Sequence, residues 1–174
     1  MPTEGLTEVQ ETQLVELLSL MGARMSAAVY NAIAAKTALT AIETVILRET
    51  GGDPQILLTQ RPPEDVHYAG QWHSPGSMLR ASDAPDKFDT PIDFVHPFDR
   101  VGKEIGVPIE VVEFADYVFQ RTPRGVENGL VFICRATGEP TKGTWFPADA
   151  LPEPLIEHHR PIIKAALEAR WPPQ

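Results

Sequence analysis

Three side chains between positions 100 and 104 are spaced so that they could act together. Arg100, Lys103 and Glu104 follow an i, i+3, i+4 spacing, which places them on one face of a helix. Two cations beside one carboxylate could bind an anionic phosphate through charge-assisted hydrogen bonds. The same spacing allows an Arg100–Glu104 salt bridge on a solvated helix, which would stabilise it by about 0.3–0.5 kcal/mol. Both interpretations stay open from the sequence.

A second group of candidate ligand-binding side chains lies between positions 61 and 73. Arg61 ends a predicted strand and is a candidate cation for a binding pocket. His67 and His73 could donate or accept hydrogen bonds from a ligand. Tyr68 and Trp72 could stack on a base, but the alternation of its strand equally allows Trp72 to fill the core.

Acidic side chains gather in the segment 83–93, at Asp83, Asp86, Asp89 and Asp93. Hard divalent cations prefer carboxylate oxygens, so this segment could build a metal site. An acidic loop interrupted by prolines is equally typical of plain solvated surface. Cys134 shares a strand face with Leu130 and Phe132, which favours a small core residue over a nucleophile.

The N-terminal segment 1–37 is predicted to be a helical extension. Apolar residues recur at three- to five-residue steps over 6–35, Thr7 with Gln10 offers a capping box, and Gly22 is a candidate break into two helices. The apolar stripe could cover a face or edge of a sheet, or it could form a homodimer contact.

The rest of the chain, 38–174, is predicted to be one α/β domain with a mixed sheet. Strands are expected over 39–48, 56–61, 72–74, 77–80, 111–121 and 130–135, and in a segment that ends at Trp145-Phe146. A helix is expected from Pro91 or Asp93 to Ile105, with Gly106 as its stop, and another over 153–170. The segments 62–71 and 122–129 are expected to be loops.

Two stretches resemble the Nudix superfamily. Gly70-Gln-Trp-His-Ser-Pro-Gly-Ser77, which follows a hairpin ending in Leu58-Thr-Gln-Arg61, resembles the strand that enters a Nudix box, and Glu104-Ile-Gly-Val107 resembles the end of that box. The resemblance covers about residues 38–172 and implies a Nudix-type α/β/α sandwich. The N-terminal helical extension lies outside it.

The box departs from the family pattern at the positions that carry its chemistry. Asp99 stands where the family has Arg, Arg100 where it has the first Glu, and Lys103 where it has the second. The segment between Gly76 and Asp99 is longer than the pattern, and Asp89 is a possible stand-in for its loop glutamate. The resemblance therefore leaves Glu104 and Asp89 as the candidate metal ligands.

The resemblance implies a hydrolase that cleaves a nucleoside diphosphate linked to another group, with Mg²⁺ or Mn²⁺ as cofactor. Glu104 and Glu127 are then the candidate catalytic residues, with Glu127 placed in a loop between two strands. Two cations beside one carboxylate repel a divalent ion, by about 4 kcal/mol for each pair of unit charges at about 4 Å and an effective dielectric constant of 20. Binding of the metal is therefore doubtful and activity is expected to be weak or lost. The alternative is a non-catalytic module that binds a nucleotide or phospho-ligand or acts as a scaffold.

The composition of the chain argues against some classes of binding partner. The chain has 174 residues, with 24 acidic and 15 basic side chains, and a formal net charge of −9. This charge argues against a nucleic-acid polymer or an anionic membrane surface as the main partner, but not against a small phosphorylated ligand. One cysteine, no signal-peptide pattern and no membrane-spanning run favour the cytoplasm.

Overall fold

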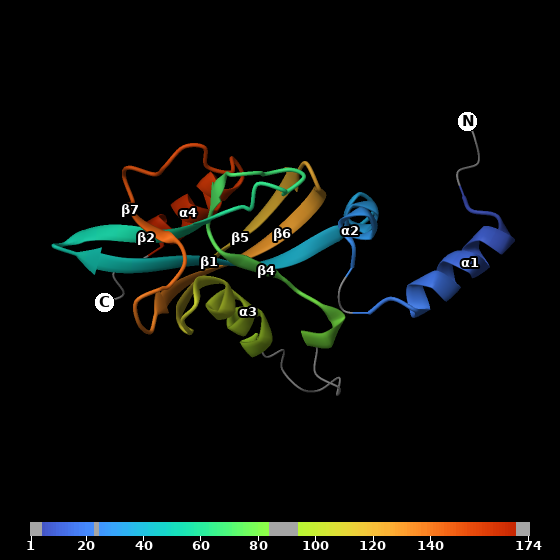
Figure 1. The fold of residues 1–174 in the computed structure, drawn as a ribbon, viewed down its shortest axis with the longest axis horizontal. Helices are drawn as coiled ribbons and strands as arrows, with labels where there is room; N and C mark the ends of the chain where they lie inside the picture. The colour runs from blue at the N-terminus through green and yellow to red at the C-terminus, as the bar shows by residue number, and fades with distance from the viewer. Residues whose placement is uncertain (1–4, 23–24, 84–93, 170–174) are drawn as a thin grey trace.

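The computed structural model describes residues 5–22, 25–83 and 94–169 (Figure 1). The predictions for Asp86, Asp89 and Asp93, and for the start of the helix that ends at Ile105, lie outside the described residues. The helices are α1 Glu8–Ser19, α2 Ala27–Ala34, η1 Ala81–Asp83 (a 3₁₀ turn), α3 Val95–Ile105 and α4 His159–Glu168. The strands are β1 Ala38–Thr50, β2 Asp53–Gln60, β3 Trp72–His73, β4 Gly76–Met78, β5 Ile109–Thr122, β6 Gly125–Ala136 and β7 Thr144–Pro147.

A mixed sheet forms the centre of the molecule. Its strands lie in the order β3-β2-β1-β6-β5, with β4 paired to β1 and β7 paired to β2. β1 and β6 run parallel, whereas the other pairs are antiparallel. β1 is buried over seven consecutive residues, Ala41 to Leu47, as expected of a strand covered on both faces.

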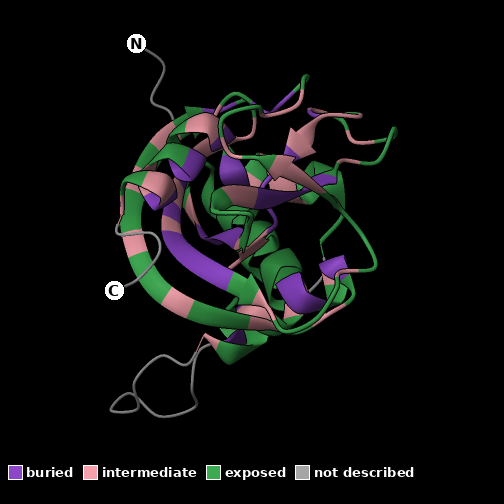
Figure 2. Ribbon diagram, turned by 90° about the vertical axis from the view of Figure 1, so that its left-hand side faces the viewer, coloured by how far each residue is buried: buried purple, intermediate pink, exposed green. Residues whose placement is uncertain are grey.

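One helix covers each face of the sheet, and each covers its own apolar cluster (Figure 1). α4 buries Ile162, Ile163 and Ala166 in the first cluster, and α3 buries Val101 and Ile105 in the second. Figure 2 shows buried strand segments in the interior, while the edge strand β5 is mainly exposed. The predicted α/β/α sandwich is confirmed, and Gly106 ends α3 as predicted.

Two predicted element boundaries are wrong. β6 begins at Gly125, so the predicted loop 122–129 shrinks to a tight turn, and Glu127 lies in a strand. The final helix begins at His159 instead of near residue 153. The segment before it is held against β3, because the Trp72 amide donates to the Pro154 carbonyl (2.8 Å) and the Ile156 amide donates to the Trp72 carbonyl (2.9 Å).

The N-terminal extension forms two helices, and the capping box of Thr7 and Gln10 is present. None of the residues of α1 is buried, and its leucines and valines are exposed, so α1 does not cover the sheet as the first interpretation expected. α2 does contact the domain, since Ala34 is buried and α2 packs near the start of β6. The homodimer stays a prediction. In the described part of the chain, no helix is long and apolar enough to span a membrane.

Candidate functional site

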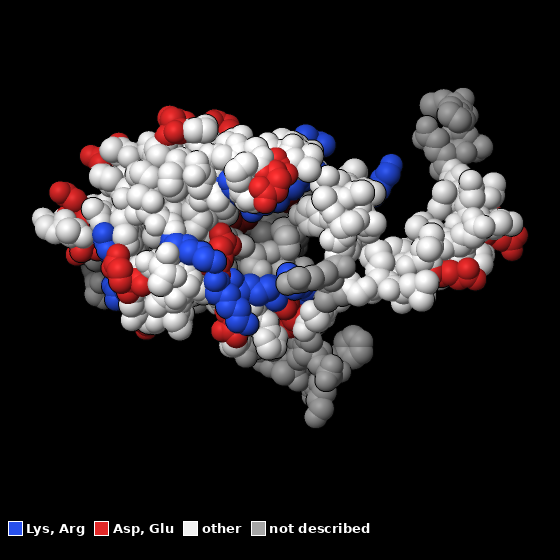
Figure 3. All heavy atoms as spheres, viewed as in Figure 1, with Lys and Arg blue, Asp and Glu red and all other residues white. Residues whose placement is uncertain are grey.

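A cavity of about 890 Å³ opens between the N-terminal extension and the domain. Its wall combines apolar side chains of the extension with polar side chains of β1, β3 and β4, of the β5–β6 turn, of Arg61 just after β2, and of His159 at the start of α4. Figure 3 shows this face hollowed beside the helices, with basic side chains along the hollow. Among the described residues, three arginines line the cavity: Arg61, Arg80 and Arg124.

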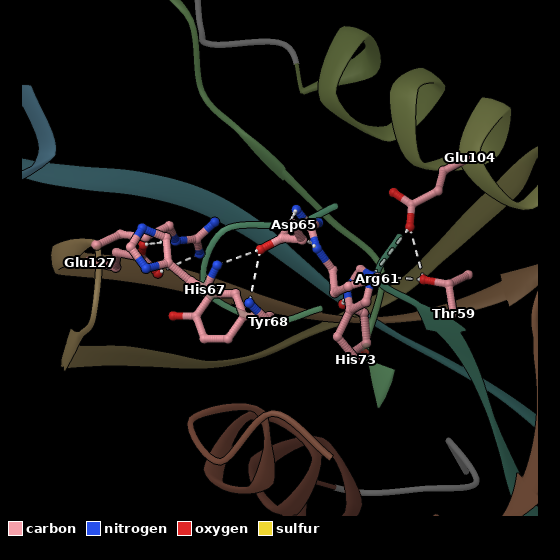
Figure 4. Close-up of polar contacts among 10 residues, drawn as sticks. Thr59, Arg61, Asp65, His67, Tyr68, His73, Glu104 and Glu127 are labelled. Carbon is pink, nitrogen blue, oxygen red and sulfur yellow. Dashed lines mark hydrogen bonds and ion pairs between the residues drawn. The ribbon is translucent and has the colours of Figure 1, made fainter. Parts of the chain in front are cut away.

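Arg61 is held in place by a carboxylate from the following loop. Its guanidinium donates to Asp65 Oδ2, with Nε at 2.9 Å, and forms an i, i+4 ion pair with it. Asp65 Oδ1 accepts from the backbone amides of His67 and Tyr68, at 3.0 and 2.9 Å (Figure 4). Burial opposes these contacts, but the hydrogen bonds from Arg61 and the two amides outweigh it and lower the pKa of Asp65 to about 2. The predicted pocket cation Arg61 is thus a pre-oriented lining residue.

A chain of polar contacts runs from His73, which lines the cavity, through Thr59 to Glu104, and the last two lie behind the lining (Figure 4). His73 Nε2 lies 3.0 Å from the Thr59 hydroxyl, which donates to Glu104 Oε1 at 2.9 Å, and His73 Nδ1 lies 3.0 Å from the Ser74 carbonyl. Burial lowers the pKa of His73 to about 4 and raises the pKa of Glu104. Glu104 is therefore held by a neighbour from β2 instead of by a charge on its own helix.

A polar cluster at the β5–β6 turn contributes Arg124 to the wall, and no pattern in the sequence indicated it. Arg124 forms an ion pair with Glu127, with Nε to Oε1 at 2.9 Å, and its guanidinium lies over the Tyr68 ring at 5.3 Å. Glu127 was predicted to be a catalytic base in a loop, but it lies in β6 and its carboxylate pairs with Arg124. This pair could not be predicted from the sequence, because it depends on a turn of two residues between β5 and β6, where a longer loop was expected.

Glu43 on β1 is a second residue that the sequence did not single out. Its side chain is buried at the cavity wall, and Oε2 has no partner among the described residues. Burial, followed by repulsion from Glu127, raises the pKa of Glu43 to about 8, so the carboxyl is mostly protonated at neutral pH. Gly76 makes room for it, because a Cβ at that position would lie 2.7 Å from Glu43 Oε2.

Arg100, Lys103 and Glu104 were predicted to act together on one face of a helix, but in the structure they have different surroundings. Arg100 donates to both oxygens of Asp83, at 2.8 and 2.7 Å, and to the Ser77 hydroxyl at 2.8 Å. The predicted Arg100–Glu104 salt bridge is therefore wrong, and Arg100 is engaged within the fold. Lys103 is exposed. The phosphate-binding role predicted for Arg100 and Lys103 stays a prediction, with Arg100 already paired.

Trp72 packs into the core, edge-on against Phe146, with ring centroids 5.0 Å apart. Trp72 does not line the cavity. Of its two predicted roles, the structure therefore agrees with packing against the core and not with stacking on a ligand. Cys134 is fully buried in the second apolar cluster, as expected of a core residue.

The described residues do not fit the divalent metal that the resemblance implies. Glu104 of α3 lies beside the cavity-lining His73, with 3.8 Å between Oε1 and His73 Nε2, and the same Oε1 accepts from Thr59. Within 5–22, 25–83 and 94–169, no group of three or more His, Cys, Asp or Glu side chains could hold a metal ion. Asp83, which could have served as a ligand, is committed to Arg100, and Asp89 lies outside the described residues.

Comparisons with known proteins assign the fold. No protein-family model matches the chain, and no curated protein matches it. A MutT NUDIX hydrolase from Burkholderia pseudomallei is similar in structure, with 23% identity, a TM-score of 0.51, and coverage of 75% of this chain and 98% of that one. The NUDIX domain of Shewanella oneidensis NrtR, solved with ADP ribose, has 22% identity and a TM-score of 0.55, with coverage of 83% and 98%.

A third similar structure comes from a different setting. The C-terminal domain of mouse MUTYH, solved in complex with human PCNA, has 15% identity and a TM-score of 0.56, with coverage of 76% of this chain and 89% of that one. These likenesses show that the chain has the Nudix fold. At such identities they show the fold and do not assign a substrate.

Proposed function

We propose that the chain binds a small phosphorylated ligand, of the class of nucleoside diphosphates linked to another group, in the cavity between α2 and the sheet. The observation that carries the proposal is the set of arginines on its wall, Arg61, Arg80 and Arg124. Guanidinium groups match phosphate oxygens in charge and geometry. A similar structure, the NUDIX domain of NrtR, was solved with ADP ribose, a member of this ligand class.

Two of these cations are pre-oriented, which favours binding. Arg61 is held by Asp65 and Arg124 by Glu127, so less side-chain freedom is lost when a ligand arrives. Each guanidinium has five N–H donors, which leaves donors for phosphate after the carboxylate is satisfied. Since the described carboxylates do not fit a metal site, we infer that these cations neutralise the ligand's charge.

Calorimetric titration with ADP-ribose tests the proposal. Arg61→Gln should weaken binding about 10-fold or more, because a charge-assisted hydrogen bond contributes about 1.5–3 kcal/mol. Arg160→Gln is the matched control, since Arg160 pairs with Glu153 and Glu157 at the surface and does not line the cavity. Equal effects of the two substitutions would contradict the proposal.

Hydrolysis is the second candidate, and Glu104 favours it. Its side chain is about one-third exposed, with 35% of its surface accessible, and its raised pKa suits a group that accepts a proton from water. In that reaction, water attacks phosphorus, the bridging P–O bond breaks, and the proton leaves water for Glu104. Release of nucleotide from ADP-ribose that falls on Glu104→Gln would favour hydrolysis, whereas binding without release would favour the binding module.

A scaffold role is the remaining alternative, and the mouse MUTYH domain bound to PCNA is its structural precedent. Failure of every phosphorylated probe to bind would favour it. We further propose a cytoplasmic location, which rests on the single cysteine, Cys134, and a homodimer, which rests on the exposed apolar stripe of α1.

A further inference from the structure

We propose that α2 of the N-terminal extension completes a subsite for the uncharged, ring-bearing nucleoside end of the ligand, with Tyr30 and Glu43 as its hydrogen-bonding residues. This inference rests on the proposed function. It assigns the nucleoside end of the ligand to the part of the cavity next to α2, and the diphosphate to the arginines. It concerns a segment that lies outside the part of the chain resembling the Nudix domain.

The first observation is a pair of unsatisfied polar atoms on the cavity wall. Tyr30 Oη and Glu43 Oε2 are both buried, and neither has a hydrogen-bond partner among the described residues. Leaving a polar atom buried without a partner costs about 1–3 kcal/mol. A ligand that offers hydroxyl, carbonyl or ring-nitrogen groups would recover this cost on binding.

The second argument is that burial favours the neutral form of both groups. Burial raises the pKa of the Tyr30 phenol further above its usual value, and Glu43 is mostly protonated. Neither side chain can supply the positive charge that a phosphate requires. Both suit a neutral partner with donors and acceptors, such as a nucleobase or a ribose.

The third observation is the apolar lining contributed by the same extension. Leu18, Met21 and Met25 line the cavity from the N-terminal side, and Leu39 lines it at the start of β1. Methionine side chains adapt to flat rings and make favourable contacts with them. An apolar wall next to neutral hydrogen-bonding groups is the combination that a nucleoside needs and a bare diphosphate does not.

Two probes separate the ends of the ligand in one experiment. ADP-ribose carries nucleoside and diphosphate, whereas inorganic pyrophosphate carries the charge alone. Tyr30→Phe, which removes one hydroxyl and keeps the ring, should weaken ADP-ribose binding about 5- to 10-fold and change pyrophosphate binding less than about 2-fold. Tyr117→Phe is the control, because Tyr117 is an exposed tyrosine on β5 whose hydroxyl donates to Asn128 outside the cavity lining.

Each outcome has a distinct meaning. If Tyr30→Phe leaves ADP-ribose binding unchanged, or weakens both probes equally, the nucleoside subsite is overturned while the proposed binding function stands. If the wild-type chain binds neither probe, both are overturned. Selective loss of ADP-ribose affinity in Tyr30→Phe, with normal behaviour of Tyr117→Phe, supports the subsite.

Discussion

At the scale of single residues, the site depends on carboxylates that hold cations in place. Asp65 holds Arg61, Glu127 holds Arg124, and Asp83 holds Arg100. Arg61 and Glu104 could be singled out from the sequence because of their types and positions. The partnerships could not, because Asp83 and Arg100 lie 17 positions apart and meet only through the packing of α3 on β4.

The Arg100–Asp83 pair is expected to be a structural contact. Asp83→Asn should lower the free energy of unfolding by about 2 kcal/mol, since it leaves a mostly buried guanidinium facing a neutral amide. Urea unfolding at pH 7 measures the change. Glu139→Gln removes an exposed partner of Arg48 and should cost less than about 0.5 kcal/mol. Equal losses would show that the pair adds nothing beyond a surface contact.

At the scale of elements, hydrophobic patterning predicted nearly every helix and strand, but it misplaced the 122–129 loop and the start of α4. Gly and Asn in 122–129 indicated a loop, yet β6 extends through them, because pairing with β1 and β5 outweighs local propensity. The apolar stripe of α1 predicted burial, but the helix is exposed in the structure. The role of α2 could not be predicted, since it depends on how α2 meets β6.

The packing of α2 against β6 is expected to depend on Gly125. A Cβ at this position would lie 2.1 Å from the Ala34 carbonyl oxygen, and its φ of +147° disfavours other residues. Gly125→Ala should therefore displace α2, weaken ADP-ribose binding about 5-fold or more, and lower the thermal midpoint. Gly138→Ala is the control, because its Cβ would meet the Val107 side chain at an ordinary 3.4 Å. Unchanged ADP-ribose affinity in Gly125→Ala would contradict the assigned role of α2.

At the scale of the whole molecule, stability should depend on three histidines near the cavity, of which His73 and His159 are buried and His158 is half-buried. The His73 and His159 rings lie 5.7 Å apart, and the His158 and His159 rings 4.8 Å apart. Burial lowers the pKa of His73 and of His158 to about 4, and that of His159 well below its usual value. The folded chain thus resists protonation that the unfolded chain accepts below about pH 6.5.

The sign of the pH dependence follows. Between pH 6.5 and 4 the unfolded state binds more protons at these histidines, so the free energy of unfolding falls as the pH falls, by up to about 1.4 kcal/mol per pH unit for each. Glu43 acts in the opposite sense, since its raised pKa makes stability fall as pH rises towards 8. We expect maximal stability near pH 6.5, and a loss of more than about 2 kcal/mol by pH 5.

Urea unfolding across pH 5–8 checks this profile. Between pH 6.5 and 5, His158→Gln should reduce the slope of the free energy of unfolding against pH by the equivalent of about one proton. His96→Gln, at an exposed position of α3, should leave this slope unchanged. A stability that rises as the pH falls from 6.5 to 5 would contradict the lowered pKa values of these histidines.

Metal dependence of binding tests the central claim most directly, because the cations of the cavity are proposed to take the place of a metal. Calorimetric titration of the wild-type chain with ADP-ribose is performed in EDTA and again in excess Mg²⁺. The account expects binding in EDTA with an affinity within about 3-fold of the value in Mg²⁺. Binding that disappears in EDTA and returns with Mg²⁺ would contradict it.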